Sequence, residues 1–335
     1  MSGYWIDSYN EDLVRKSSGE AFVVGFGAWD QVPALYNVAH PHLISLRDTR
    51  KPLRSKDPLM VADEICNKIK SFPTEVQKVC VAHSLDEEHS NRSAALMWEL
   101  EFVRRVHQHG LKAIAWNIAF GNFDNAEAQE FSQLWQEADY LGPHSYIGYS
   151  FNTNSLVINE ETCYRYRKWQ NFPRHKCLPT EFGIDHWDGI KPFPEKPGWR
   201  NLDLTDATVK QVIAQVINQQ IADGLIGSIY FTLLNQNSEW EPYYPTDSML
   251  SYWKNIKFNW QETDMAGDAA LALQALDIIY GEMNTLISES AFLKADALLI
   301  RHPDIALKAT EFDALAKDAQ SHLITIKNAV ILPNL

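Results

Sequence analysis

Short apolar runs alternate with longer amphipathic segments along the first 260 residues. Apolar runs bounded by turn residues are typical of buried strands, and the segments between them have the period of helices. This alternation predicts repeated β/α units with a parallel sheet, and eight such units close a (β/α)8 TIM barrel. We therefore predict this barrel for residues 1–260, with strands at 4–9, 21–28, 43–48, 78–83, 112–119, 139–146, 177–183 and 227–234.

Helical periodicity is clearest in the segment 92–110, where Leu96, Leu100 and Val103 recur on one face. The first two connections between strands are too short for regular helices, so none is expected there. The remaining connections predict helices near 58–71, 126–138, 159–171 and 205–224.

The pattern changes after residue 260. Residues 266–301 contain no proline, and their apolar residues recur at steps of three and four. A second helix can begin at Pro303, since proline is favoured at the first helical position. We predict a helical hairpin over 266–335, which either packs back on the barrel or projects and mediates assembly, as a homo-oligomer or with another partner.

Composition limits the classes of partner. The 335 residues are 45% apolar and 12% aromatic without low-complexity segments, which predicts an ordered globular chain. The formal charge of −13 would repel nucleic acid and anionic membranes, whereas a neutral glycan remains compatible with it.

Targeting and cysteine signals are weak. The chain has no apolar run of about 18 residues and no basic, apolar start. We expect a protein made in the cytoplasm without a signal peptide, either kept there or released, for example with a virion. The four cysteines are widely spaced and are expected to be reduced core thiols. Neither zinc spacing nor a dinucleotide fingerprint is present, so we expect no metal or cofactor.

Polar and aromatic side chains gather where the predicted strands end. In a (β/α)8 barrel the C-terminal strand ends carry the site. Sugars need hydrogen-bonding groups for their hydroxyls and aromatic rings for their C–H faces. The predicted glycan-binding residues are Trp29, Arg47, His83, Asn117, His144, Tyr146, Asp185, Trp187, Asn235 and Trp240.

Glu181 interrupts the apolar run "CLPTEFG". A buried carboxylate costs several kcal/mol unless it is paired or faces a cleft. Glu181 therefore has either a structural partner, such as Arg47, or a catalytic role.

The segments "AIAWNIAFGNFD", "ADYLGPHSYIGYSF", "YRYRKW" and "LPTEFGIDHWDG" followed by "GW" resemble the phage and bacterial glycoside hydrolase-like (β/α)8 barrels, which are related to the large superfamily of retaining glycosidases. The resemblance covers residues 75–235 and leaves out the hairpin. It implies that Glu181 is the nucleophile, because such proteins carry a nucleophilic glutamate after the seventh strand.

Two positions depart from the family pattern. Relatives have Asn-Glu after the fourth strand, where this chain has His83 and Ser84, and His-Glu-Tyr after the sixth, where Ser145 replaces the glutamate. A serine hydroxyl has too high a pKa to donate the proton that a leaving group needs. The expected acid/base is therefore Asp86 or Glu87, with Glu88 and His83 as alternatives.

These observations support two hypotheses. In the first, the chain is a glycoside hydrolase that cleaves a polysaccharide or cell-wall glycan, with Glu181 as nucleophile. In the second, it is a catalytically silent barrel that binds glycan or serves as a structural component of an assembly.

Overall fold

The structure is a computed structural model. It describes residues 1–50, 56–85, 91–118, 123–150, 153, 155–184, 198–202, 204–234, 241 and 243–258. All of them belong to one compact unit, residues 1–260. The hairpin predicted for 266–335 lies outside the described residues.

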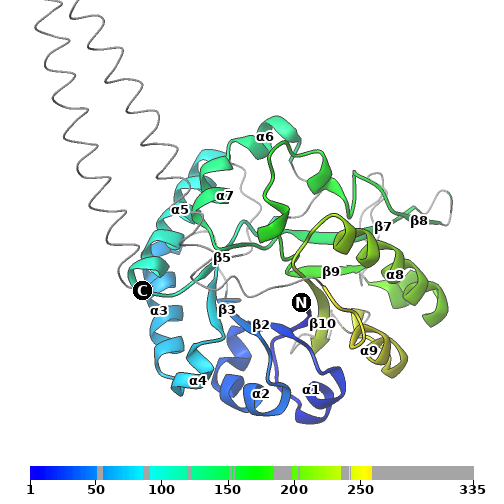
Figure 1. The fold of residues 1–335 in the computed structure, drawn as a ribbon, viewed down its shortest axis with the longest axis horizontal. Coiled ribbons are helices and arrows are strands. Elements are labelled where there is room, and N and C mark those ends of the chain that lie inside the picture. Colours follow the sequence, from blue (N-terminus) through cyan, green and yellow to red (C-terminus); the bar gives the residue numbers. More distant parts are fainter. Residues whose placement is uncertain are drawn as a thin grey trace, which may run out of the picture. The chain divides into compact units, whose positions relative to one another are not determined.

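A curled, mostly parallel sheet forms the centre of this unit, and helices cover its outer face (Figure 1). Its strand order is β6-β5-β4-β3-β2-β1-β10-β9-β7-β8, and only β7 and β8 pair antiparallel. The α/β class and the parallel sheet expected from the sequence are confirmed. The strands are β1 (Ser2–Ile6), β2 (Ala21–Gly25), β3 (Leu43–Arg47), β4 (Cys80–His83), β5 (Ala113–Ala115), β6 (Tyr140–Leu141), β7 (His144–Ser150), β8 (Ser155–Val157), β9 (Glu181–Ile184) and β10 (Ser228–Leu234).

The sixth predicted strand is broken in two at Gly142 and Pro143, between β6 and β7. β6 pairs with β5, and β7 pairs with β9. Two backbone hydrogen bonds cross this break. The N–H of His144 in β7 donates to the carbonyl of Ile118, beyond β5, at 2.7 Å. The N–H of Leu178, ahead of β9, donates to the carbonyl of Leu141 in β6 at 2.8 Å. Consecutive residues of the chain thus link β6, at one end of the strand order, to β7, which pairs with β9 and β8 near the other end.

Side-chain caps fix where several helices begin. Asn10, Thr205 and Thr246 accept a backbone N–H of the first turn, and Asp124 forms a capping box with Glu127. The α-helices are α1 (Glu11–Ser17), α2 (Val32–Ala39), α3 (Pro58–Lys70), α4 (Thr74–Gln77), α5 (Arg92–Gln108), α6 (Asn125–Gln129), α7 (Ser132–Glu137), α8 (Asp206–Ala222) and α9 (Asp247–Trp253).

Three expectations about these elements were wrong. The first two connections do form helices, the short α1 and α2. The segment 126–138 holds two helices rather than one. The segment 159–171 forms turns and a 3-10 helix at Arg165–Arg167, because Asn159 and Thr162 bond to neighbouring backbone groups that an α-helix would use.

Two apolar layers follow from the alternation of side chains along the strands. One layer lies between sheet and helices, where Trp253 of α9 stacks on Phe182 at 5.5 Å. The other fills the interior of the curled sheet, where Trp5 packs on Phe231 at 5.4 Å. Burial of these faces is the main stabilising contribution.

The four cysteines are free and buried, as the sequence predicted. Burial raises the pKa of Cys66, Cys80 and Cys163 to about 12, and it raises that of Cys177 as well. None of the helices in the described part of the chain combines the length and apolarity needed to cross a membrane.

Candidate functional site

Glu181 is the first residue of β9, whereas the strand predicted at 177–183 placed it near the C-terminal end. Its side chain is 10% exposed and lies among polar groups from two other strands. Arg47 of β3 donates from Nη1 to Oε1 at 2.9 Å, and the hydroxyl of Tyr146 donates to Oε2 at 2.8 Å. His144 Nδ1 lies 3.5 Å from the same Oε2. We call these four residues the Glu181 cluster.

The Glu181 cluster holds an ionised carboxylate. Burial alone would raise the pKa of Glu181, but the charges of His144 and Arg47 and the hydrogen bonds from Tyr146 and Arg47 together hold it below its ordinary value. Both oxygens are oriented by donors. A fixed, ionised carboxylate can act as a nucleophile or stabilise a cationic transition state.

His83 and Asn117 are used inside the protein. His83 is fully buried, with Nδ1 3.2 Å from Ser45 Oγ and Nε2 2.6 Å from Asn117 Oδ1. Because that amide oxygen only accepts, Nε2 carries the hydrogen. Burial and the charge of Arg47 hold the pKa of His83 well below its usual range. We therefore correct its assignment as a sugar ligand or acid: His83 is a neutral internal support.

Asn117 also supports the interior rather than a ligand. Its Nδ2 donates to Ser84 Oγ at 2.7 Å, and its residue exposure is 1%. The preceding Trp116 has φ 62°, a left-handed conformation that costs roughly 1–3 kcal/mol for a bulky residue. The rings of Trp135 and Trp169, at 5.0 and 4.7 Å, hold Trp116 in place. This packing sets the direction of Asn117.

A buried carboxyl that the sequence did not point to lies behind Ser84. Ser84 Oγ donates to Glu99 Oε1 of α5 at 3.0 Å. Burial raises the pKa of Glu99 to about 8, against hydrogen bonds from Ser84 and the backbone of Trp116. Only the position of Glu99 on the apolar face of α5, near Leu100 and Val103, could have signalled its burial.

Ser145 does not face the Glu181 cluster. It follows His144 in β7, and its hydroxyl donates to the carbonyl of Cys163 at 3.1 Å and accepts from Gln220 of α8 at 3.0 Å. The glutamate of the family pattern would therefore lie under α8 here. Its replacement at position 145 says nothing about the proton donor.

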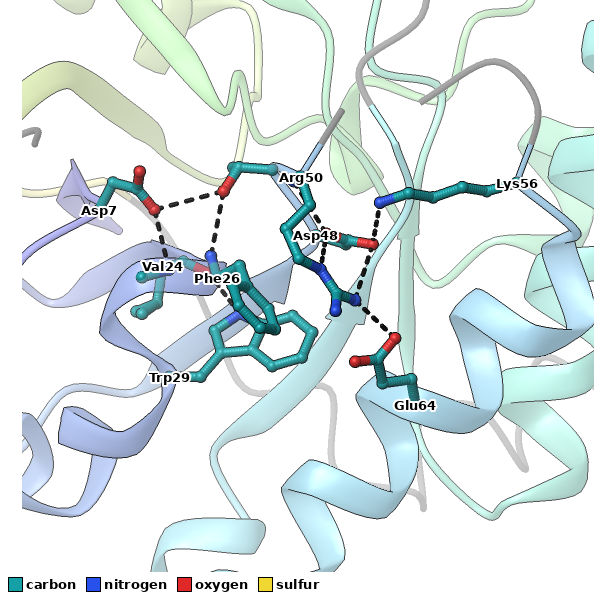
Figure 2. A network of polar contacts seen from close by, with 10 residues as sticks. Asp7, Val24, Phe26, Trp29, Asp48, Arg50, Lys56 and Glu64 are labelled. Carbon is teal, nitrogen blue, oxygen red and sulfur yellow. Dashed lines mark hydrogen bonds and ion pairs between the residues drawn. The ribbon is translucent and has the colours of Figure 1, made fainter. Parts of the chain in front are cut away.

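Trp29 is not a stacking platform. It is 4% exposed, its Nε1 donates to the carbonyl of Val24, and its ring packs edge-on against Phe26 at 4.9 Å (Figure 2). Arg50 covers Phe26, with its guanidinium carbon 3.9 Å from the ring centroid. We therefore remove Trp29 from the sugar-binding set.

Two aspartates lie beyond the ends of β1 and β3 (Figure 2). Asp48 is 1% exposed and accepts from the Arg50 backbone and side chain and from Lys56. Burial raises its pKa, but these hydrogen bonds outweigh burial and hold it below the ordinary value. Asp7 is partly buried, and the backbone N–H of Gly27 donates to its Oδ1 at 3.2 Å.

The remaining predicted site residues lie outside the described residues. The structure therefore brings together Arg47, His144, Tyr146 and Glu181 from the predicted set, and it places His83 and Asn117 beside them as buried supports. Among the described side chains, no group of three histidines, cysteines or carboxylates could hold a metal ion. The undescribed members are Asp86, Glu87, Asp185, Trp187, Asn235 and Trp240.

No protein-family model and no curated protein matches the chain. In structure it is similar to the spore cortex-lytic enzyme SleL of Bacillus megaterium, at 12% identity and TM-score 0.47, over 77% of this chain and 75% of that one. It is also similar to a chitinase of Chromobacterium violaceum, at 13% and 0.46, over 77% and 100%. A Bacillus licheniformis endo-β-1,4-glucanase matches at 10% and 0.45, over 76% and 60%. At these values the likeness concerns the course of the backbone alone.

Proposed function

We propose that the chain is a glycoside hydrolase with Glu181 as nucleophile, on a closed (β/α)8 barrel whose sixth strand is interrupted at Gly142 and Pro143. The hydrogen bonds across this interruption support the closed barrel. One observation carries the function: an ionised carboxylate faces the interior of the sheet with each oxygen fixed by a donor from another strand.

In the proposed reaction a Glu181 oxygen attacks the anomeric carbon and forms a glycosyl ester as the bond to the leaving oxygen breaks. Water then attacks the same carbon and releases Glu181. Arg47 and Tyr146 keep the carboxylate unprotonated and aimed before attack, which lowers the cost of reaching the transition state.

The substrate class that fits this chain is a neutral polysaccharide or cell-wall glycan. A net charge of −13 opposes a polyanionic substrate. His144 and Tyr146 provide hydrogen-bonding groups at the carboxylate, and the aromatic residues proposed at the rim, Trp187 and Trp240, would stack on sugar rings.

A second candidate is a silent barrel that binds glycan or supports an assembly through residues 266–335. One observation favours it. At the family's acid/base position Ser84 is buried and bonded to Glu99 and Asn117, so no carboxyl occupies that position.

Release of reducing ends from a panel of cell-wall and storage glycans, at pH 4 to 8, separates the candidates. We expect activity in the wild type and a loss of several orders of magnitude in Glu181→Gln, which removes the attacking charge and keeps the shape. Glu75→Gln is the matched control, because Glu75 is an exposed glutamate of α4 and should retain full activity.

Equal, non-zero rates in wild type and Glu181→Gln would contradict the proposed nucleophile. Absence of cleavage by a folded wild type over the whole panel would instead favour the silent barrel. Far-ultraviolet circular dichroism of each variant shows that the compared proteins are folded.

A further inference from the structure

Asp7 lies on the same face of the sheet as Arg47. In the parallel pair of β1 and β2, Ile6 pairs with Val24, so Asp7 comes opposite Gly25, which pairs with Arg47 in turn. Residues paired in this way point to one face of a sheet. Arg47 uses this face to reach Glu181, and Arg47 is also the charged neighbour that acts on the carboxyl of Asp7.

Gly25 makes room for this carboxyl. A Cβ at position 25 would lie 2.1 Å from Asp7 Oδ1, which is closer than atoms approach without a bond. The carboxyl of Asp7 thus rests directly on the backbone of β2, and only glycine permits that approach.

One oxygen of Asp7 is fixed and the other is turned away from its donors (Figure 2). Oδ1 accepts from the N–H of Gly27 at 3.2 Å and from Thr49 Oγ1 at 3.3 Å. Thr49 is itself oriented, because its Oγ1 accepts from the N–H of Phe26 at 3.2 Å. Within the described residues, Oδ2 has no hydrogen-bond partner, so this oxygen can meet a ligand.

The other two carboxyls described near this interior cannot supply a proton to a ligand. Asp48 is ionised and enclosed by Arg50 and Lys56. Glu99 of α5 is buried behind Ser84, whose hydroxyl donates a hydrogen bond to it.

We propose that Asp7 is the proton donor and later the base of the glycosidase reaction, a role that rests on the proposed function of Glu181. As the glycosidic bond breaks, Asp7 Oδ2 gives its proton to the leaving oxygen and the bonding electrons go to that oxygen. Water then attacks the anomeric carbon, gives a proton back to Asp7 and frees Glu181. Atoms and charges balance without a metal or cofactor.

The protonation of Asp7 fits this role. Burial raises its pKa above the ordinary value, and the opposing effects of Gly27, Thr49 and Arg47 are smaller. Glu181 has a lowered pKa, so the two carboxyls differ as an acid and a nucleophile must.

The test compares Asp7→Asn with wild type on the cleaved glycan and on a 2,4-dinitrophenyl glycoside of the sugar that the wild type releases. General acid catalysis contributes about 10²–10⁴-fold, and a dinitrophenolate leaves without a proton. We expect a loss of about that size on the glycan, less than about tenfold on the first turnover of the activated substrate, and rescue of later turnovers by azide. Asp30→Asn, which changes an exposed aspartate paired with Lys68, should leave both rates unchanged.

The pH profile of Thr49→Val distinguishes a proton donor from a purely structural Asp7, because only a proton donor would shift that profile. Loss of its hydrogen bond should raise the pKa of Asp7, because that bond favours the ionised form. The alkaline limb of kcat/KM on the glycan should therefore shift to higher pH, since the donor must be protonated.

The outcomes separate this inference from the proposed function. Loss of activity in Glu181→Gln with full activity in Asp7→Asn overturns the role of Asp7 alone. Equal losses in Asp7→Asn on both substrates without azide rescue, or an unmoved alkaline limb in Thr49→Val, overturn it too. A folded wild type that cleaves neither substrate overturns both proposals.

Discussion

Glu181 and Glu99 are both buried carboxyls, but different groups compensate for their burial. Glu181 has a guanidinium and a phenol within 3 Å, and it stays ionised. Glu99 has a hydroxyl and a backbone N–H, which are weaker partners, so its pKa rises instead. A buried acid thus loses its charge where no cation pairs with it.

Glu99 should make stability depend on pH. Its folded-state pKa is about 8, against an ordinary value of 4.5, so between these values the folded state binds a proton that the unfolded state has lost. The free energy of unfolding should therefore fall as pH rises through this window, by at most about 1.4 kcal/mol per pH unit from this group.

Urea unfolding of Glu99→Gln at pH 5, 6, 7 and 8 measures that contribution. The stability of the variant relative to wild type should increase with pH, because glutamine does not titrate. Glu101→Gln, an exposed change on the same helix α5, should run parallel to wild type. Parallel curves for Glu99→Gln would show that Glu99 is not protonated in the folded state.

Single residues were predictable where their own segment requires a particular kind of partner. A buried carboxylate in an apolar run needs a partner, and Arg47, the structural partner expected from the sequence, does bond to Glu181. The roles of Trp29 and Ser145 could not be predicted, because residue type does not show which side of a strand end faces the helices. The burial of Glu99 could not be predicted, because the sequence does not show that this position of α5 lies against Ser84.

At the scale of elements, period and length predicted the strands better than their ends. Pro143 directly precedes β7, and Pro179 lies two residues before β9. Neither proline has an N–H to donate to a neighbouring strand, so strand pairing is interrupted at these positions. At the interruption before β7, the chain passes from β6, which pairs with β5, to β7, which pairs with β9. Hydrophobic alternation cannot show such a break, because the residues on both sides remain buried.

Gly142 should be intolerant of any side chain. A Cβ there would lie 2.6 Å from Asn117 Oδ1 and 2.8 Å from side-chain carbons of Ile114 and Thr180, which come from the β5 segment and the segment before β9. We expect Gly142→Ala to destabilise the fold by about 1–3 kcal/mol through overpacking. In Gly183→Ala the nearest neighbour would be 3.4 Å away, an ordinary contact, so this control should unfold close to wild type in urea.

At the scale of the whole molecule, the alternation of apolar runs and helical segments predicted the parallel sheet because each unit buries one face of its helix on the strands. The outer apolar layer extends from Tyr4 of β1 to Phe258. All core residues in the described part of the chain thus lie within residues 1–258.

A chain ending at residue 260 should therefore fold. We expect a single cooperative thermal transition followed by circular dichroism, because the core lies within the retained residues. If residues 266–335 mediate assembly, light scattering should show a smaller particle than expected from the loss of those residues alone. An insoluble or non-cooperative product would show that this segment completes the fold.

The reactivity of the four buried thiols can report local unfolding of the protein. They sit in α3, in β4, before the 3-10 helix at 165–167 and before β9, so they sample separate regions. A thiol reagent reacts with the thiolate, which both burial and the raised pKa suppress. Alkylation kinetics read by mass spectrometry would therefore time the opening of each region in the unmodified protein, with no label introduced.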